Sequence, residues 1–278
     1  RWTYPSYEGR TTIDKTVADT AGIAVEPAGP AVLVTTIDLL GRVEFSPAAK
    51  AEVKARFPGV VTRALKTVGD SVQVGETLAI VESSQSLQSY AVMAPIAGVV
   101  LERRTNVGDV ASADALYVIG DLSRVQANLH VFPADVARVS NAGKVTVRSL
   151  DGHMMTETTL SSFLPTAEAA TQTLVARVIL PNANKRWLPG MAVQASAVVA
   201  EESVPLAVRT SGLQRFRDFT VVFARVGETY EVRMLDLGRQ SKDWAEVLGG
   251  IKPGQPYVTA NSFLIKADIE KSGASHDH

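Results

Sequence analysis

Apolar and polar residues alternate in short runs along most of the chain. In VQANLHV (125–131) every second residue is apolar, the pattern of a strand that is buried on one face. The runs KVTVRSL, TLVARVIL and AVQASAVV behave in the same way, and turn residues separate them. Spaced strands of this kind predict a small β-barrel over residues 122–201. The earlier run AVLVTTIDLLGRVEFS (31–46) is expected to add strands to it.

One segment inside the barrel region has a different pattern. FPADVARVS (132–140) predicts one or two helical turns, because Pro133 suits the first turn of a helix, where its missing N–H costs least. The Asn-Ala-Gly sequence at 141–143 then ends the helix. Helix is expected to be scarce elsewhere.

The last third of the chain predicts another β domain. TVVFARV and YEVRMLDLG flank Gly227, Glu228 and Thr229, which is typical of a hairpin. IKPGQPYVTANSFLI is expected to end in a short apolar strand. The tail EKSGASHDH (270–278) is polar and has no periodicity, so we expect it to be mobile.

The region before the barrel contains an internal repeat. Gly-Val-Val at 59–61 recurs at 98–100, and Val-Gly-Asp at 68–70 recurs at 107–109. Each copy consists of short β-branched strands broken by Gly-Asp or Gly-Glu turns. The shared spacing favours two related halves over a chance likeness between valine-rich strands. Residues 51–83 and 94–121 therefore predict a flattened β-sandwich of the biotinyl/lipoyl type.

The segment VESSQSLQSYAVMAPIAGVV (81–100) begins like the hairpin that carries biotin or lipoate. Such a hairpin needs a lysine at its tip, since an amine must attack the activated acid. Gln85 occupies that position here. The sandwich is thus predicted to be a scaffold that carries no prosthetic group.

Composition narrows the class of protein. The chain has 278 residues and a net charge of −1, which gives no electrostatic footprint for nucleic acid. No apolar run approaches the roughly 20 residues that span a bilayer. RWTYPSYEGR at the start lacks the regions of a signal peptide, which indicates a cytosolic protein or a targeting segment outside this sequence. The absence of cysteine excludes disulfides and thiolate chemistry but leaves the compartment open.

Catalytic motifs are missing as well. The sequence has no GxSxG, P-loop, dinucleotide fingerprint or HExxH motif, so we expect a protein that is not an enzyme and requires no cofactor.

Taken together, these features resemble a known family. The chain resembles the periplasmic adaptor subunits, or membrane fusion proteins of HlyD-like type, of resistance-nodulation-division efflux pumps. The split lipoyl-like halves carry the likeness. So does WLPGMAV (187–193), which is similar to the family's L-x-P-G-M-x-V barrel motif except for Trp187 in the first place. VPLAVRTSG and the segment down to SFLIKAD resemble the membrane-proximal domain, with its Gly-Leu/Ile-x-x-Gly turn near 250–254.

The resemblance implies a mainly β chain with nested domains and little helix. The implied domains are N-terminal strands shared by the membrane-proximal and barrel domains (1–50), the lipoyl-like domain (51–121), the β-barrel (122–201), the membrane-proximal domain (202–269) and a tail (270–278). VESSQSLQSYAVMAPIAGVV and the terminal SFLIKADIEKSGASHDH look closest to the cobalt-zinc-cadmium branch.

The resemblance also implies a location and partners. The protein is expected in the periplasm, tethered to the inner membrane through a segment outside this sequence. Its expected partners are an inner-membrane proton-driven pump, an outer-membrane channel and further copies of itself in a ring.

One departure concerns the way the channel is reached. Most adaptors place a long α-helical hairpin between the lipoyl halves. Here only about a dozen residues lie between Ser83 and Ile96, and they contain no heptads for two antiparallel helices. The loop tip, with Ser84, Gln85 and Ser86, is therefore the candidate surface that would replace the hairpin.

Candidate metal ligands are few. His153 and Met154 suit a soft ion such as Cu(I) or Ag(I), although a plain strand would turn Met154 and Met155 to opposite faces, one to the core and one to solvent. His130 lies on the polar face of a strand, where it is either a ligand or a solvated side chain. Two histidines and a carboxylate in the tail are a weak zinc set or a solubilising tail. These tail residues are His276, Asp277 and His278. The ions considered are Zn, Co, Cd, Cu and Ag.

Basic residues are the remaining candidates for partner contacts. Arg103 and Arg104 either protect a strand edge or meet an acidic face of a neighbouring subunit. In RTSGLQRFRDF, the residues Arg209, Arg215 and Arg217 form either an exposed loop or a surface for the pump.

The leading hypothesis is a heavy-metal efflux adaptor. The alternatives are an adaptor for drugs or small molecules, a soluble periplasmic metal-binding protein without a pump, and a carrier domain of a larger enzyme. Gln85 argues against the last of these.

Overall fold

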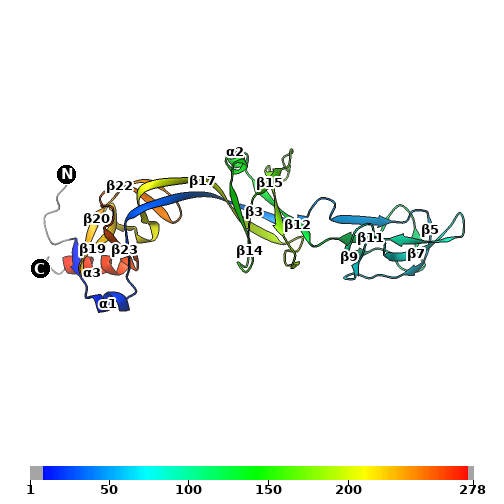
Figure 1. The fold of residues 1–278 in the computed structure, drawn as a ribbon, viewed down its shortest axis with the longest axis horizontal. Helices are drawn as coiled ribbons and strands as arrows, with labels where there is room; N and C mark the ends of the chain where they lie inside the picture. Colours follow the sequence, from blue (N-terminus) through cyan, green and yellow to red (C-terminus); the bar gives the residue numbers. More distant parts are fainter. Residues whose placement is uncertain (1–8, 275–278) are drawn as a thin grey trace. The chain divides into compact units, whose positions relative to one another are not determined.

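The computed structural model describes residues 9–274, which form two compact units. The first comprises residues 9–36 and 199–274, and the second comprises residues 37–198. The boundary falls inside two long strands, β3 (Gly29–Phe45) and β17 (Ala192–Arg209), both labelled in Figure 1. The second unit is therefore an insertion in the sequence of the first unit, and β3 and β17 are the two connections between them.

The predicted repeat is confirmed as two four-stranded sheets. One sheet runs in the order β10 (Val110–Ala111), β5 (Gly59–Ala64), β7 (Thr77–Ser83), β8 (Ser89–Met93), and the other in the order β6 (Ser71–Val72), β9 (Gly98–Arg103), β11 (Ala115–Gly120), β4 (Lys50–Lys54). Each sheet takes two strands from β4–β7 and two from β8–β11, so the second half begins with β8, a few residues before the predicted start at residue 94. Strands at equivalent places in the two sheets differ by four in their number: β10 matches β6, β5 matches β9, β7 matches β11 and β8 matches β4. This correspondence is the pseudo-two-fold symmetry expected of a lipoyl-like sandwich.

The Gly-Asp turns join the two halves reciprocally. Gly69 and Gly108 both have φ +94°, a conformation that side chains disfavour. The Gly69 amide donates to the Val100 carbonyl at 2.9 Å, and the Gly108 amide donates to the Val61 carbonyl at 2.8 Å. The same valines are fully buried in the sandwich core. The repeated motif therefore specifies both the turn and the packing between halves.

The second part of the same unit is the predicted β-barrel. The strands follow the order β14 (Met155–Thr158), β13 (Lys144–Ser149), β17, β3, β12 (Arg124–Val131), β16 (Leu174–Pro181), β15 (Leu160–Phe163). The Thr158 hydroxyl donates to the Ile179 carbonyl at 3.0 Å and ties β14 to β16. Two strands from opposite ends of the order thus meet, as closure requires.

Burial in β12 follows the alternation with one exception. Val125, Ala127 and Leu129 are buried as predicted. Gln126, expected on the solvent side, is only 5% exposed and donates to the Asn128 side chain at 2.9 Å. The predicted helical turns are confirmed as η1 (Pro133–Asp135) and α2 (Val136–Ser140).

The first unit is built on a six-stranded sheet. Its order is β1 (Arg10–Thr12), β20 (Thr229–Met234), β19 (Phe219–Val226), β23 (Pro256–Ala260), β2 (Ala24–Pro27), with β18 (Gln214–Phe216) beside β19. The predicted β19–β20 hairpin is confirmed. The strands β21 (Asp236–Gln240) and β22 (Trp244–Gly249) pair with each other. β22 also pairs with the last three residues of β17, which the short helix η2 (Thr210–Gly212) follows.

The end of the chain differs from the prediction. SFLI is not a strand: it opens the helix α3 (Ser262–Ala274), which also includes the first residues of the predicted tail. Ile265 and Ile269, one helical turn apart, are both buried. A second short helix, α1 (Lys15–Thr20), starts after Asp14, whose carboxylate accepts from the Thr16 amide at 2.8 Å. Within residues 9–274, none of the helices has the length and apolar character to cross a bilayer.

Candidate functional site

The tip between β7 and β8 is a closed five-residue turn. The Ser83 hydroxyl accepts from the amides of Gln85 at 3.3 Å and Ser86 at 3.4 Å. The Ser83 amide donates to the Gln88 carbonyl at 3.0 Å, which closes the base of the turn. Ser84, Gln85 and Ser86 are all exposed. The tip therefore presents hydroxyl and amide groups on a fixed backbone, and no amine.

Apolar residues surround this tip. Leu87 has φ +55° and is 74% exposed. Beside the turn, the Phe57 and Tyr90 rings meet edge to face at 5.8 Å, and the Phe57 amide donates to the Tyr90 hydroxyl at 3.1 Å. Phe57 nevertheless remains 48% exposed. The tip is thus an organised surface without reactive groups, which suits contact with another protein better than chemistry.

The arginines at the end of β9 have partners within their own sandwich. Arg103 donates to the Asn106 side chain at 2.7 Å, and Arg104 donates to Glu102 at 2.8 Å. Arg104 remains about half exposed.

His130 lies in a small polar cluster at the end of β12. Its Nδ1 is 3.1 Å from the Thr173 hydroxyl and 3.3 Å from Glu168. The cluster fixes the loop between β15 and β16, because Glu168 and Thr173 also form a bridge across that loop. One imidazole and one carboxylate are fewer ligands than a closed zinc site has.

The sequence HMM lies in a depression of about 360 Å³ on the barrel. His153, Met154, Met155 and Trp187 line it together. Met155 is 60% exposed, as expected for one of the two methionines, whereas Met154 is partly buried and does not reach the core. β14 starts at Met155, so Met154 belongs to the preceding turn and is not bound by strand alternation.

The sequence analysis left Met155 out of this site because of strand alternation, and it did not connect Trp187 with the site. The tryptophan at position 187, where the barrel motif has leucine, was the one feature of the sequence that could have indicated that this residue belongs to the site. Within residues 9–274, no three side chains among His, Cys, Asp and Glu gather to hold a metal. The predicted ligands His276, Asp277 and His278 lie outside the described residues.

The three arginines of the first unit that are candidates for a partner contact have different environments. The Arg209 guanidinium lies 4.0 Å from the centre of the Trp244 ring and 3.3 Å from Glu26. Arg215 is exposed on β18, and Arg217 is exposed in the following turn with φ +54°. Arg209 therefore holds its own domain together, and the other two remain the candidates for a partner surface.

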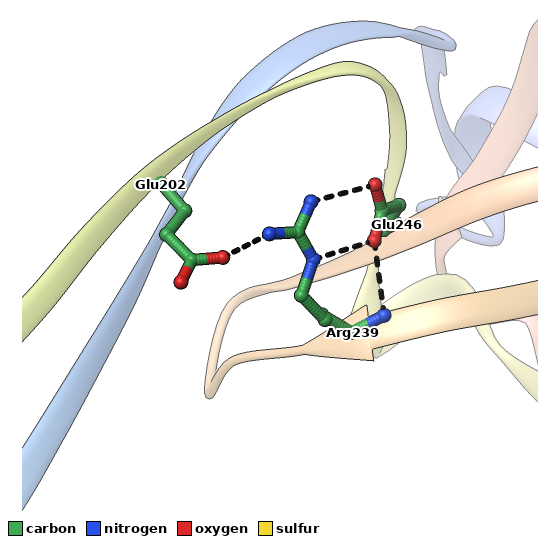
Figure 2. Close-up of polar contacts among 3 residues, drawn as sticks. All are labelled: Glu202, Arg239 and Glu246. Carbon is green, nitrogen blue, oxygen red and sulfur yellow. Dashed lines mark hydrogen bonds and ion pairs between the residues drawn. The ribbon is translucent and has the colours of Figure 1, made fainter.

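An ion network missed from the sequence fastens the β21–β22 hairpin. Figure 2 shows the Arg239 guanidinium between two carboxylates: Glu246 accepts two hydrogen bonds at 2.9 Å, and Glu202 of β17 takes the other side. The hydrogen bond from Arg239 is the main reason why the pKa of Glu246 falls to about 2. All three residues belong to the first unit, where this network is structural.

Three family models match successive parts of the chain. A CzcB-like barrel-sandwich hybrid domain matches residues 49–121, a CusB-like β-barrel domain matches 125–201, and a CzcB C-terminal circularly permuted SH3-like domain matches 206–266. The three matches follow the order of the sandwich, the barrel and the C-terminal β domain described above.

Curated relatives and solved structures agree with these matches. The cation efflux system protein CzcB of Alcaligenes sp. (strain CT14) is 34% identical over 70% of this chain, and the cobalt-zinc-cadmium resistance protein CzcB of Cupriavidus metallidurans is 33% identical over 70%. The chain spans only 38% of the length of each. The crystal structure of ZneB from Cupriavidus metallidurans, 20% identical, shares the fold with a TM-score of 0.54 over 94% of this chain and 98% of that one.

Proposed function

Because the chain belongs to the CzcB-like family of periplasmic adaptors, the membrane fusion proteins of heavy-metal resistance-nodulation-division systems, we propose that it links a cation pump to an exit duct. The pump lies in the inner membrane and is driven by protons, and the duct lies in the outer membrane. The chain works in the periplasm, is tethered to the inner membrane and performs no catalysis of its own.

The observation that carries this proposal is the insertion of a symmetric, unmodifiable sandwich into a barrel. The carrier-type hairpin keeps its shape but has Gln85 where a carrier needs lysine. A lipoyl-like domain without its lysine cannot carry a group for transfer, so the domain can act only through its shape and its surface. The sandwich is inserted in the barrel, and the barrel strands β3 and β17 continue into the first unit.

The cargo follows from the relatives. Proteins described as cation efflux and cobalt-zinc-cadmium resistance components match most of this chain, so we assign the transported ion to that group of divalent cations. No resident cofactor is needed for this role. Any ion held by the chain is cargo in transit.

Two surfaces fit the two ends of such a bridge. The exposed tip at Ser84–Ser86 is proposed to contact the exit duct or an intermediate chain, in place of helical tips. Arg215 and Arg217 are proposed to contact the pump, and Arg104 is proposed to contact a neighbouring copy in a ring.

The test is recovery of the detergent-solubilised cognate pump on immobilised full-length chain. The proposal predicts retention of the pump by the wild type and weaker retention by R215A/R217A. A matched control is K185A, since Lys185 is an exposed cation in a barrel loop with φ +51°. A chain that retains no pump would contradict the adaptor function.

A further inference from the structure

The depression on the barrel contains a donor set that the adaptor role does not use. Its lining includes an imidazole from His153, thioethers from Met154 and Met155, and the indole of Trp187. Trp187 stands where the barrel motif of the family resembled by this sequence has leucine. The tryptophan is 4% exposed, whereas His153 is exposed. The site thus has a buried aromatic wall and an accessible rim.

The backbone that carries the nitrogen and sulfur donors is fixed. The Ser149 hydroxyl accepts from the Met154 amide at 3.0 Å, and the Ser149 amide donates to the Met154 carbonyl at 3.0 Å. Asp151 accepts from the His153 amide, also at 3.0 Å. The hydrogen bond from the Ser149 hydroxyl is the main reason why the pKa of Asp151 lies below its usual value. Two consecutive donor residues are therefore held in one bent turn.

The opposite wall is fixed just as firmly. The Asn182 side chain accepts from the Trp187 amide at 2.9 Å and donates to the Trp187 carbonyl at 2.7 Å. The indole Nε1 donates to the Thr156 hydroxyl at 3.3 Å, one residue beyond Met155. Trp187 is thus attached to the strand that carries one of the two methionines.

The chemistry of the lining selects the class of ion. Imidazole and thioether donors prefer soft ions such as Cu(I), and an aromatic face favours a weakly hydrated cation. The lining contains no acidic side chain, and Arg186 adds a positive charge. A divalent ion such as Zn(II) or Co(II) would find neither carboxylate nor thiolate there. A single positive charge is easier to accommodate.

We propose that His153, Met154, Met155 and Trp187 form a binding site for a soft monovalent cation, Cu(I) or Ag(I). The site goes beyond the divalent-cation efflux proposed above, because the ion it takes is not one of the proposed cargo ions. Binding itself is a property of the isolated chain.

The test is a titration of the full-length chain with Ag(I) in chloride-free buffer, followed by calorimetry and tryptophan fluorescence. We expect one ion per chain, with affinity reduced at least about 100-fold in M154L/M155L, since loss of ligands exceeds the 10–100-fold effect of outer-shell changes. H153Q tests the imidazole at an exposed position where folding is not at stake. M93L is the matched control, because Met93 is 55% exposed on the sandwich.

Two further variants locate the ion. W187F should abolish the quenching of fluorescence by Ag(I) and weaken binding by about tenfold or less, as expected for a cation–aromatic contact. H276Q/H278Q should leave the affinity unchanged, and a molar excess of Zn(II) should not displace Ag(I).

Three results would overturn the site: no Ag(I) binding, equal affinity in M154L/M155L and wild type, or loss of binding in H276Q/H278Q. Each of them is separable from failure of the adaptor function. A chain that binds the pump but not Ag(I) would refute the site alone.

Discussion

Two hairpin turns in the second unit share one device and differ in what they expose. The turn after β7 is organised by the hydroxyl of Ser83, which is 5% exposed, and the turn after β13 by the hydroxyl of Ser149, which is 4% exposed. In each turn the hydroxyl accepts a hydrogen bond from a backbone amide that follows it. The first turn presents Gln85 and Leu87, and the second presents His153 and Met155.

The comparison shows that the buried serine fixes the backbone of each turn, whereas the exposed side chains of the turn determine what the turn can bind. The first turn has the shape of a carrier hairpin but lacks an amine, so its surface is available for docking only. The second has soft donors beside a buried indole, so it can bind an ion. In the account proposed above, the first turn serves assembly and the second turn serves ion binding.

The largest expected effect concerns the base of the first turn. A Cβ at Gly59 would lie 2.0 Å from the Glu82 carbonyl oxygen and 3.0 Å from the Ser83 Cα, both of them backbone atoms. G59A should therefore destabilise the sandwich by about 3 kcal/mol or more, in the upper range for single substitutions. V60A, at a neighbouring residue that is 42% exposed, is the control for denaturant unfolding. Wild-type stability in G59A would show that the turn does not depend on this contact.

The next effect separates the two serines. S149A removes the acceptor for the Met154 amide and the donor to Asp151, so it should cost about 1–3 kcal/mol and also weaken Ag(I) binding. S83A removes two longer hydrogen bonds and should cost about 1 kcal/mol without changing Ag(I) binding. Unfolding and Ag(I) titration measure both quantities. An equal loss of Ag(I) affinity in S83A and S149A would contradict the claim that only the second turn takes part in ion binding.

A smaller effect is expected at Gly152 in the second turn. Its φ is +74°, and a Cβ there would meet nothing within 4 Å. G152A should cost about 1–2 kcal/mol, the cost of placing a side chain in the left-handed region. Because no atoms collide, the fold should persist, and circular dichroism should be unchanged at room temperature. A cost as large as that of G59A would indicate a contact that this geometry does not contain.

The smallest effect is the response to acid. The lowered pKa of Asp151 means that its ionised form stabilises the second turn above the ordinary value of 3.8, and that this contribution is lost as pH falls through the lowered pKa. The hydroxyl and carbonyl acceptors of the first turn do not titrate. In an NMR titration, the His153 amide should shift in this acid range and the Ser86 amide should not. In D151N the His153 response should disappear, and its persistence would point to another carboxylate.

The sandwich was predictable because its signals are local and repeated. Gly59, Gly69 and their counterparts mark close approach or positive φ wherever they recur in the sequence. The helix α3 was missed, because a short apolar run such as SFLI fits a strand or a buried helical turn equally well. The spacing of Ile265 and Ile269 was the signal for the helix.

The candidate site was predictable only in part. The donor sequence HMM and the unusual Trp187 were both visible, but they are far apart in the chain. Closure of the barrel brings them to one depression, and it also places Met154 before the strand. Side-chain networks such as Arg239 with Glu246 and Glu202 depend on such long-range pairing and have no local pattern to reveal them.

The most direct test of the central claim is cation accumulation in cells that produce the pump and the exit duct, with and without this chain. The account predicts that cobalt, zinc or cadmium accumulation falls only when pump, duct and chain are all present. It also predicts that loss of the pump abolishes the effect of the chain. Equal accumulation without the chain, or a decrease that the chain causes without the pump, would contradict the adaptor function.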